Sequence, residues 1–312
     1  MQKIKTFINL LKKNKSAIPQ ALFDNIKHCA FSRFIPDTLY VRFAYFAFLH
    51  KKLDLKNPLT FNEKLNWLKL YDRNPLYTTL VDKYAVKDWV SEKIGKQYVI
   101  PTLGVWDKFD DIDFNELPNQ FVLKCTHDSG GLVICKDKAS LDVDEARKKI
   151  SSSLKEKYYY EYREWPYKNV VPRIIAEKYV EDSCDSELRD YKFYTFNGEP
   201  KFLLLATNRQ SKDKPLCFDY FDMDFNHLPL TNHWHPNNME SPPHKPPRFK
   251  EMQFLAKCLA EGFPQVRVDF YEVDGNIFFG EMTFFPQGGF LKLHPDSWEK
   301  EWGDLIILPS QK

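Results

Sequence analysis

The chain lacks a strong net charge, a long apolar run and any closely spaced pair of cysteines. Among its 312 residues, 45 are basic and 43 are acidic, so the formal net charge is only +2. Nucleic-acid-binding proteins usually carry a pronounced basic excess, and we therefore expect no nucleic-acid partner. The six cysteines are scattered without a C-x-x-C pair, which is the wrong spacing for a disulfide framework or a structural zinc site. Reduced thiols in a cytoplasmic protein are the simplest expectation.

Glycine is also scarce, at 11 residues, and the chain contains neither a G-x-G-x-x-G motif nor a P-loop. The two best-known glycine-rich nucleotide motifs are therefore absent. Aromatic residues make up 16% of the chain, and charges are interspersed with apolar stretches, which excludes a disordered or fibrous protein. A chain of this length predicts one compact enzyme of two or three lobes.

The first twenty residues combine apolar positions at helical spacing with lysines. The lysines at 12, 13 and 15 interrupt the apolar run, so we expect neither a signal peptide nor a transmembrane helix. Two interpretations stay open for this stretch. It either packs as a surface helix on its own domain, which we favour, or rests on the anionic inner face of a membrane.

The periodicity of the chain predicts an α+β fold built from antiparallel hairpins. Short helices are expected over residues 1–58, with a buried aromatic face at 41–50. Further helices are expected from the capping box at Thr60–Glu63 onward, over 78–94, over about 141–157 and over about 249–261. Strands are expected at 98–102 and 173–180 and in three hairpins, at 121–137, 192–207 and 265–285.

The last hairpin carries the clearest chemical signal. Asp269 and Glu281 flank the Asp274-Gly275 turn, and counting from that turn brings the two carboxylates together across the ladder. Like charges at such positions repel unless a cation neutralises them, and hard oxygen ligands on rigid strands suit Mg²⁺. Arg267 points to the same face as Asp269 and could stabilise an oxyanion. A plain salt-bridge cluster is the alternative interpretation.

Lys124 lies in an otherwise apolar strand, directly before the polar loop at His127–Gly131. Such a lysine must reach either solvent or an anion. Backbone N–H groups of a glycine-bearing loop can close over phosphates, whose charge the ammonium group complements. A simple edge-strand lysine explains the pattern as well. His127 within the loop serves either near a phosphate or in stabilising the loop itself.

Taken together, these motifs resemble the ATP-grasp enzymes, most closely the TupA-like branch from bacterial surface-polysaccharide pathways. The resemblance covers about residues 58–312 and is strongest at R-V-D-F-Y (267–271) and F-G-E-M-T-F (279–284). It also includes V-D-K-Y-A-V-K (81–87), I-G (94–95), I-P-T (100–102), F-V-L-K (121–124), H-D-S-G-G (127–131), I-I-A-E-K-Y-V-E (174–181) and D-Y-K-F (190–193).

The resemblance implies an ATP-grasp fold preceded by an N-terminal helical extension at residues 1–58. The ATP-grasp domain would then comprise residues 59–312, with a small lid lobe at about 118–177, a hinge at about 177–182 and a large lobe at about 183–312.

The resemblance further implies ATP and Mg²⁺ as cofactors and gives individual residues a role. Those expected to bind the nucleotide are Lys87, Lys124, His127, Ser129, Gly130, Gly131, Glu177, Lys178, Tyr179, Val180 and Asp190. Those expected to bind metal are Asp269, Glu281 and Thr283, and the catalytic pair is Arg267 and Lys192. The family usually has Asn where Thr283 stands, which leaves a second metal ion open. The acid that binds ribose is open among Glu181, Glu187 and Asp190.

The resemblance implies a ligase that forms an amide through an acylphosphate. Its partners would be a carbohydrate acceptor bearing a carboxylate, namely a uronic-acid unit of a surface polysaccharide, and an amine donor. A peripheral contact with the membrane or with the polysaccharide-assembly machinery is compatible with this role. The alternatives are a phosphotransferase acting on a sugar hydroxyl, a nucleotide-sugar glycosyltransferase and a nucleotide-binding module without turnover.

Overall fold

The computed structural model describes residues 18–182, 188–208 and 213–310. The chain divides into two compact units. The first unit comprises Met1–Arg73, Tyr159–Trp165 and Phe285–Lys312, and the second comprises Asn74–Tyr158 and Pro166–Phe284. In the part of the chain that the structure describes, no helix has the length and apolarity required to cross a bilayer.

The first unit is mainly helical. Its elements are α2 (Ile18–Lys27), η2 (Ala30–Phe34), α3 (Asp37–Leu49), α4 (Phe61–Tyr71), α8 (Tyr159–Tyr162), η7 (Pro286–Gly289), β11 (Leu293–His294) and α10 (Ser297–Leu305). The expectation of short helices before residue 58 is confirmed within 18–49, and the residues before 18 lie outside the described part. The aromatic-rich segment 41–50 forms most of α3, which buries Tyr40, Val41, Ala44 and Tyr45.

The capping box predicted at the start of α4 is confirmed. The Thr60 hydroxyl accepts a hydrogen bond from the Glu63 N–H, and the Glu63 carboxylate accepts one from the Thr60 N–H. These two bonds satisfy N–H groups that a helix start otherwise leaves without partners. α4 then packs on α10, where the Phe61 and Trp302 rings meet edge to face at 5.1 Å.

The second unit contains two antiparallel sheets. The smaller sheet has the strand order β1-β4-β2-β3, formed by β1 (Thr102–Trp106), β2 (Phe121–Cys125), β3 (Leu132–Cys135) and β4 (Ile174–Lys178). The larger has the order β10-β9-β5-β6-β7, formed by β5 (Asp190–Phe196), β6 (Glu199–Thr207), β7 (Cys217–Phe221), β9 (Gln265–Val273) and β10 (Asn276–Thr283). β8 (Thr231–Asn232) is a further short strand.

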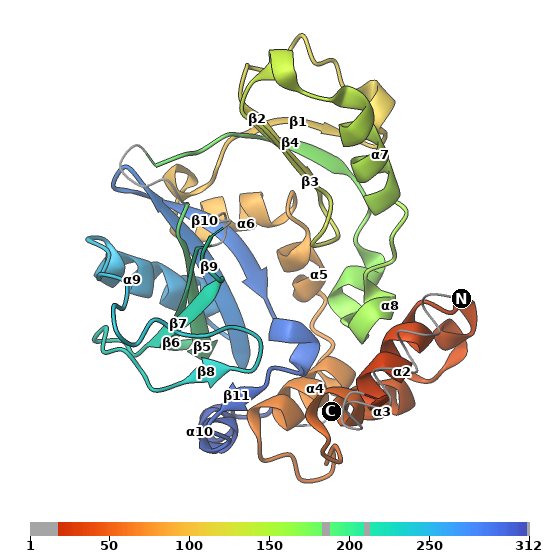
Figure 1. Ribbon diagram of the computed structural model, residues 1–312, viewed down its shortest axis with the longest axis vertical. Coiled ribbons are helices and arrows are strands. Elements are labelled where there is room, and N and C mark those ends of the chain that lie inside the picture. The colour runs from red at the N-terminus through yellow and green to blue at the C-terminus, as the bar shows by residue number, and fades with distance from the viewer. Residues whose placement is uncertain (1–17, 183–187, 209–212, 311–312) are drawn as a thin grey trace. The chain divides into compact units, whose positions relative to one another are not determined.

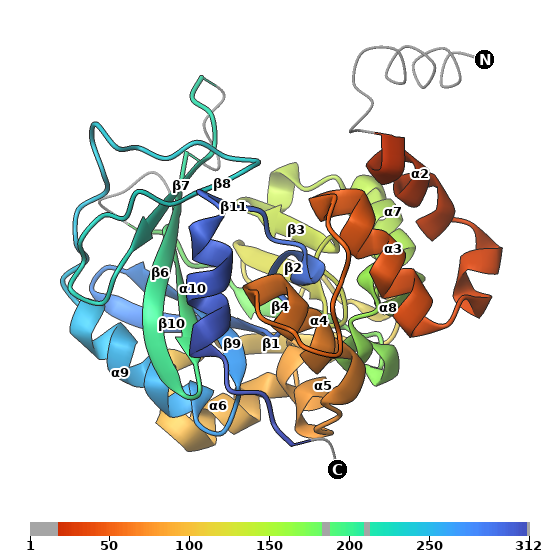
Figure 2. The ribbon, with the colours of Figure 1, turned by 90° about the horizontal axis from the view of Figure 1, so that it is seen from below.

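Helices cover one face of each sheet. α7 (Val143–Ser153) packs on the smaller sheet, and α9 (Phe249–Ala260) packs on the larger one (Figures 1 and 2). α5 (Leu76–Val81) and α6 (Val86–Ile94) precede the sheets, and α6 packs against α9. The short helices are η3 (Lys96–Tyr98), η4 (Phe109–Asp111), η5 (Lys138–Ser140) and η6 (Trp165–Asn169).

The three predicted hairpins are all present. The Asn197-Gly198 and Asp274-Gly275 turns have positive φ at both residues, 49° and 84° in the first and 48° and 73° in the second. Such a backbone suits tight two-residue turns, which is why these dipeptides signal hairpins. Strand alternation also turns Cys125 away from Lys124 and into the core beneath α7.

Two predictions were wrong. The single helix expected over 78–94 is divided into α5 and α6, because an Asp82 carboxylate oxygen accepts hydrogen bonds from the N–H groups of Tyr84 and Ala85. This local turn competes with the helical ladder. The extended piece expected at 98–102 is instead the end of η3 and a short connection, and the strand begins only at Thr102.

A buried acid in the first unit predicts a pH-dependent stability. Burial raises the pKa of Glu299 to about 7, while its carboxylate accepts a 2.6 Å hydrogen bond from the Asn62 side chain. The folded state therefore binds more protons than the unfolded state between the ordinary and the raised pKa, and the free energy of unfolding falls as pH rises through that window.

We expect Glu299→Gln to remove this loss. Relative to the wild type, the variant should gain on the order of 2 kcal/mol at about pH 8 and little or nothing at about pH 5, measured by urea unfolding. Glu301→Gln, on the exposed face of the same helix, is the matched control. An equal effect of both substitutions would contradict the attribution of the pH-dependent stability to Glu299.

Candidate active site

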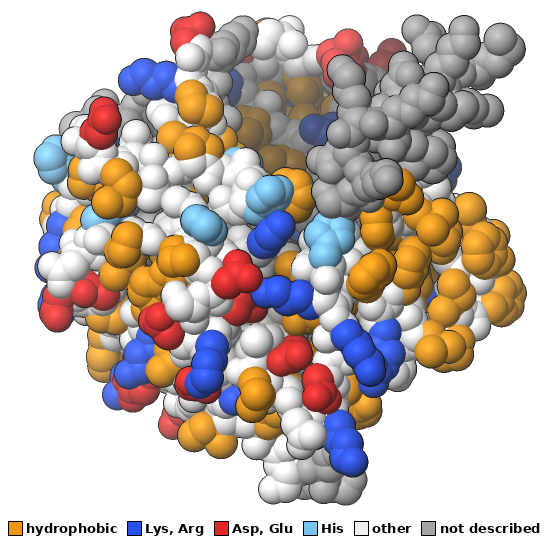
Figure 3. Space-filling model, turned by 60° about the horizontal axis from the view of Figure 1, so that its bottom comes forward, with side chains coloured by type: hydrophobic (Ala, Val, Ile, Leu, Met, Phe, Trp, Pro, Cys, Tyr) orange, Lys and Arg blue, Asp and Glu red, His pale blue; other side chains and the backbone are white. Residues whose placement is uncertain are grey.

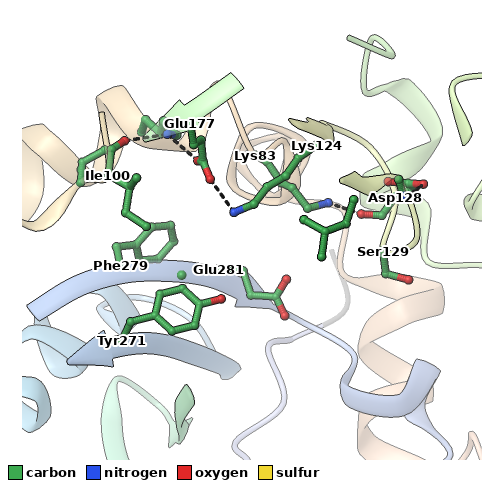
Figure 4. A pocket seen from close by; sticks show the side chains of 14 residues that line it. Lys83, Ile100, Lys124, Asp128, Ser129, Glu177, Tyr271, Phe279 and Glu281 are labelled. Carbon is green, nitrogen blue, oxygen red and sulfur yellow. Dashed lines mark hydrogen bonds and ion pairs between the residues drawn. The ribbon is translucent and has the colours of Figure 1, made fainter. Parts of the chain in front are cut away.

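A cavity of about 130 Å³ lies in the second unit, between the smaller sheet and the β9-β10 hairpin (Figure 4). Three lysines line it: Lys83 precedes α6, Lys87 lies on α6 and Lys124 lies on β2. The acids in its lining are Asp128, Glu177 and Glu281, and its apolar wall is formed by Val99, Ile100, Leu132, Tyr271 and Phe279.

Glu177 joins two of the lysines. One of its oxygens lies 2.6 Å from the Lys87 ammonium, and the other lies 2.5 Å from that of Lys124. Burial alone would raise the pKa of Glu177, but the charges of Lys124 and Lys87 outweigh it and hold the pKa below its usual value. The carboxylate is therefore ionised and sets the positions of both ammonium groups.

The register of the smaller sheet explains why these side chains meet. On the neighbouring strands β2 and β4, Val122 pairs with Glu177 and Lys124 pairs with Ile175. Lys124 and Glu177 are thus diagonal neighbours on one face, within reach of long side chains. Lys87 reaches the same point from α6, where its ammonium also donates a 2.8 Å hydrogen bond to the Ile100 carbonyl.

The loop after β2 is fixed by Asp128. Its carboxylate accepts hydrogen bonds from the Gly131 N–H, at 2.9 Å, and from the Ser153 hydroxyl on α7. The Asp128 carbonyl accepts a hydrogen bond from the Lys83 ammonium. Burial lowers the pKa of Lys83, while the charges of Glu281 and Asp128 act against that effect. Asp128 thus ties the loop to α7 and to the third lysine.

A second charged cluster lies on the larger sheet. The Arg267 guanidinium donates two 2.7 Å hydrogen bonds to Asp269, and its Nη2 also lies 2.8 Å from Glu281. The Lys192 ammonium lies 2.5 Å from Asp269 and 2.5 Å from Asp190. The register pairs Asp269 with Glu281 across β9 and β10, which confirms the proximity expected from the turn.

The ion pairs of this cluster determine the direction in which the pKa values of Asp269 and Lys192 are shifted. Burial would raise the pKa of Asp269, but Arg267 and Lys192 hold it below its usual value. Burial would lower the pKa of Lys192, but Asp190 and Asp269 raise it. The two acids that the sequence analysis paired with a metal are therefore already neutralised by side-chain cations.

The donor set fits Mg²⁺ in part. Glu281 suits a ligand role, because its side chain is 46% exposed and lines the cavity, and only one of its oxygens is engaged. Asp269 is 1% exposed, and both its oxygens accept charged hydrogen bonds, so a metal there must displace one of them. Among the described residues no group of three or more His, Cys, Asp or Glu could hold a metal. Magnesium often uses one or two carboxylates plus phosphates, and such a site remains compatible with Glu281 and Asp269.

The candidate residues named from the sequence divide into three sets. Lys87, Lys124, Ser129, Gly131, Glu177 and Glu281 line the cavity. Asp190, Lys192, Arg267 and Asp269 form the cluster on the larger sheet, joined to the cavity through the Arg267–Glu281 contact. His127, Gly130, Lys178, Tyr179, Val180 and Thr283 lie outside the cavity lining.

Several of the outlying residues have identifiable contacts. His127 is buried, and its ring Nε2 lies 3.1 Å from the Glu156 carbonyl, which favours loop stabilisation over a phosphate role. The Thr283 hydroxyl donates a 3.3 Å hydrogen bond to Glu281. Of the three acids considered for ribose, Glu181 pairs with Lys136 at 2.7 Å, Asp190 pairs with Lys192, and Glu187 lies outside the described residues.

Eight of the lining residues received no role from the sequence, namely Lys83, Val99, Ile100, Asp128, Leu132, Tyr271, Phe279 and Gly280. Lys83 has a visible signal, since it stands four residues before Lys87, but no pattern showed that both reach one cavity. Asp128 lies within the expected loop, where His127, Ser129, Gly130 and Gly131 received a role and Asp128 did not. Tyr271 and Phe279 occupy facing strands at the hairpin, and Val99 and Ile100 lie just before β1, so their common wall depends on tertiary packing.

A family model described as TupA-like ATP-grasp matches residues 63–307. The chain belongs to the TupA-like ATP-grasp family. The matched range contains every residue of the cavity and of the charged cluster, and the ATP-grasp fold follows from the same match. The resemblance noted in the sequence is thereby confirmed at the level of family and fold. No curated protein matches the chain in sequence.

Several solved structures are similar to this chain at low sequence identity. The D-alanine-D-alanine ligase from Helicobacter pylori is 11% identical, with a TM-score of 0.43, and the match covers 79% of this chain and 69% of that one. A RimK-domain ATP-grasp protein from Sphaerobacter thermophilus is also 11% identical, with a TM-score of 0.42 and coverages of 76% and 70%. The Bacillus anthracis D-alanine-D-alanine ligase complexed with ATP is 14% identical, with a TM-score of 0.38 and coverages of 71% and 55%. The chain thus spans little more than half of this last protein, and the family assignment does not depend on these structures.

The loop geometry predicts that two adjacent glycines differ sharply in their tolerance of a side chain. A Cβ at Gly131 would lie 2.5 Å from the Ser153 hydroxyl and 2.7 Å from the Cys125 sulfur, whereas at Gly130 the nearest atom would be 3.9 Å away. We expect Gly131→Ala to lower the free energy of unfolding by about 1–3 kcal/mol and to weaken nucleotide binding, since the loop must shift.

Gly130→Ala is the control and should stay within about 0.5 kcal/mol of the wild type. Both variants are compared by chemical unfolding and by titration calorimetry with ATP. Equal behaviour of the two would show that the Asp128-anchored loop is not held as described.

Proposed function

We propose that the protein is an ATP- and Mg²⁺-dependent ligase that joins a carboxylate to an amine through an acylphosphate. The observation that carries this proposal is the convergence of Lys83, Lys87 and Lys124 on one cavity, opposite Glu281. Three lysines at one cavity suit the phosphates of a nucleotide, and a carboxylate facing them suits the accompanying metal. Membership of the ATP-grasp family supports ATP as that nucleotide.

In the proposed complex, the nucleotide phosphates replace Glu177 as partners of Lys87 and Lys124. The base lies against the apolar wall of Ile100, Tyr271 and Phe279. The family resemblance places the backbone at 177–180 beside the base, and of these residues Glu177 lines the cavity. The Asp128-anchored loop, with Ser129 and Gly131, covers the phosphates. Mg²⁺, held by Glu281 and Asp269 with Thr283 nearby, would neutralise charge on the phosphates.

The cluster on the larger sheet supplies the charges for the chemical steps. A carboxylate oxygen of the acceptor attacks the γ-phosphorus. The bond between the γ-phosphorus and the oxygen that bridges it to the β-phosphate breaks, and ADP leaves. The ammonium group of Lys192 offsets negative charge during this transfer. The amine nitrogen then attacks the acyl carbon, Arg267 stabilises the oxyanion, and phosphate leaves as the amide forms. The proton lost by the amine passes to solvent.

We further propose a uronic-acid unit of a bacterial surface polysaccharide as the carboxylate substrate, and an amino acid or a simple amine as the donor. This substrate class follows the family resemblance rather than a contact in the cavity. The reaction would take place in the cytoplasm, where ATP is available. A peripheral contact with the membrane or with the polysaccharide-assembly machinery would bring the enzyme to such an acceptor.

The reaction class is tested with the purified protein, ATP, Mg²⁺, pooled uronic acids and pooled amines, with each pool omitted in turn. We expect ADP release to require the acid pool, and hydroxylamine to substitute for the amine by capturing the acylphosphate as a hydroxamate. ADP formed with a stable sugar phosphate and no hydroxamate would identify a phosphotransferase. Turnover of a nucleotide sugar instead of ATP would identify a glycosyltransferase, and nucleotide binding without ADP release would identify a binding module.

The metal assignment predicts the behaviour of Glu281→Gln. Because Glu281 is half exposed at the cavity, this variant should fold normally and yet lose about 100-fold in magnesium-dependent turnover. Asp269→Asn should also abolish turnover, but it leaves Lys192 and Arg267 with a neutral partner and is less certain to fold.

Glu261→Gln, whose carboxylate is 76% exposed and which lies outside the cavity lining, serves as the control. Turnover is measured against Mg²⁺ concentration. A Glu281→Gln protein with a wild-type rate and metal dependence would refute the metal role.

A further inference from the structure

The N-terminal helices of the first unit carry an exposed apolar surface. We name it the η2 surface, and its residues are Leu22 on α2, Phe31 and Phe34 on η2, and Leu39 and Phe46 on α3. Phe34 is 88% exposed, Leu39 60% and Phe31 56%. In Figure 3 hydrophobic side chains gather over this part of the chain, on the right of the view. Single exposed apolar residues are ordinary, but a contiguous group of large ones usually marks an interaction site.

The backbone directs the two phenylalanines outward together. Phe31 and Phe34 are three residues apart on a 3-10 helix, where side chains at i and i+3 eclipse one another. The exposed turn also contains Arg33, whose guanidinium lies 5.1 Å from the centre of the Tyr160 ring. Two aromatic rings therefore project beside a fixed positive charge.

Two of the acidic groups near the η2 surface, Asp24 and Asp37, are already paired. Asp24 lies 3.2 Å from the Lys27 ammonium, and Asp37 lies 3.1 Å from the Arg163 guanidinium and accepts 2.7 Å hydrogen bonds from the Tyr159 hydroxyl. Their negative charge is therefore offset locally, and it does not repel an anionic partner as strongly as unpaired carboxylates would.

The charge of the sequence is concentrated at the same end. Residues 1–36 contain seven basic residues and only one acidic residue, a net charge of +6, whereas the whole chain carries +2. The remaining residues together therefore carry −4. A basic excess confined to the segment that bears the exposed aromatic rings favours an anionic, partly apolar partner.

We propose that the η2 surface docks on an anionic lipid bilayer. Exposed Phe and Leu side chains enter the boundary between headgroups and acyl chains, while Arg33 and the basic excess of the N-terminal sequence attract anionic headgroups, as in other peripheral membrane segments. This contact differs from the one weighed for the first twenty residues, because Phe31, Phe34 and Leu39 carry it. It does not depend on the ligase reaction.

The test is co-sedimentation of the full chain with vesicles of phosphatidylcholine containing phosphatidylglycerol, compared with vesicles of phosphatidylcholine alone. We expect binding to the anionic vesicles that weakens with added salt. The double variant Phe31→Ser/Phe34→Ser should bind at least about tenfold more weakly, because two rings no longer leave water. Phe254→Ser, at a site on α9 that is 64% exposed, should bind like the wild type.

Four results would overturn the proposal: wild-type protein that binds neither vesicle, equal binding to both vesicle types, a double variant that binds like the wild type, or a vesicle-free dimer that the double substitution dissociates. The last would make the surface a contact between two copies of the chain. The thermal midpoint of each variant reports its folding, and Leu39→Ser replaces the double variant if that one does not fold. ATP turnover without vesicles should be unchanged in these variants, so failure of the ligase proposal is distinguishable from failure of this one.

Discussion

Two buried carboxylates, Glu177 and Asp269, each hold two cationic side chains, and the organisation of the candidate site depends on these pairings. Glu177 holds Lys87 and Lys124 on the smaller sheet, and Asp269 holds Arg267 and Lys192 on the larger one. A buried ion is costly unless its charge is matched, and removing one partner of such a pair costs about 3–5 kcal/mol. The carboxylates therefore fix four cations in position before any anion arrives.

This arrangement explains how three lysines can lie together at one cavity. Burial lowers the pKa of both Lys83 and Lys87, and Glu177 opposes that effect at Lys87. An incoming polyphosphate offers a stronger set of acceptors for the same ammonium groups, so on the proposed function it exchanges partners with Glu177 and does not enter an empty positive cavity.

Much of the fold is predictable from local signals. The Thr60–Glu63 capping box and the Asn197-Gly198 and Asp274-Gly275 turns are set by interactions a few residues apart, and each appears where the sequence predicts it. The pairing of Asp269 with Glu281 follows from counting along a hairpin. The break between α5 and α6 at Asp82 is harder to predict. One Asp82 carboxylate oxygen accepts hydrogen bonds from local N–H groups, while the other binds Arg173, 91 residues away.

The residues that form the site can also be predicted only in part from nearby sequence, because several of them meet through contacts between distant segments. Lys124 and Glu177 meet because two strands far apart in sequence pair in one register, and Lys83 reaches the loop through the Asp128 carbonyl. For the cation between Asp269 and Glu281 the sequence left a metal ion and a salt bridge to Arg267 both open, and in the structure Arg267 pairs with both acids while Lys192 pairs with Asp269. A charge pattern along the chain shows that neutralisation is required, but the identity of the neutralising group depends on tertiary contacts.

The central claim, that an acceptor carboxylate attacks the γ-phosphorus, is tested most directly by following oxygen atoms. The acid pool is supplied with a heavy-oxygen label in its carboxylates, together with unlabelled ATP and the amine pool, and the released phosphate is analysed by mass spectrometry. The account predicts one labelled oxygen in each phosphate, because a carboxylate oxygen leaves with phosphorus when the amide forms. Unlabelled phosphate would contradict it, since the γ-phosphoryl group would then have passed to water, and a stable phosphate ester without free phosphate would contradict it as well.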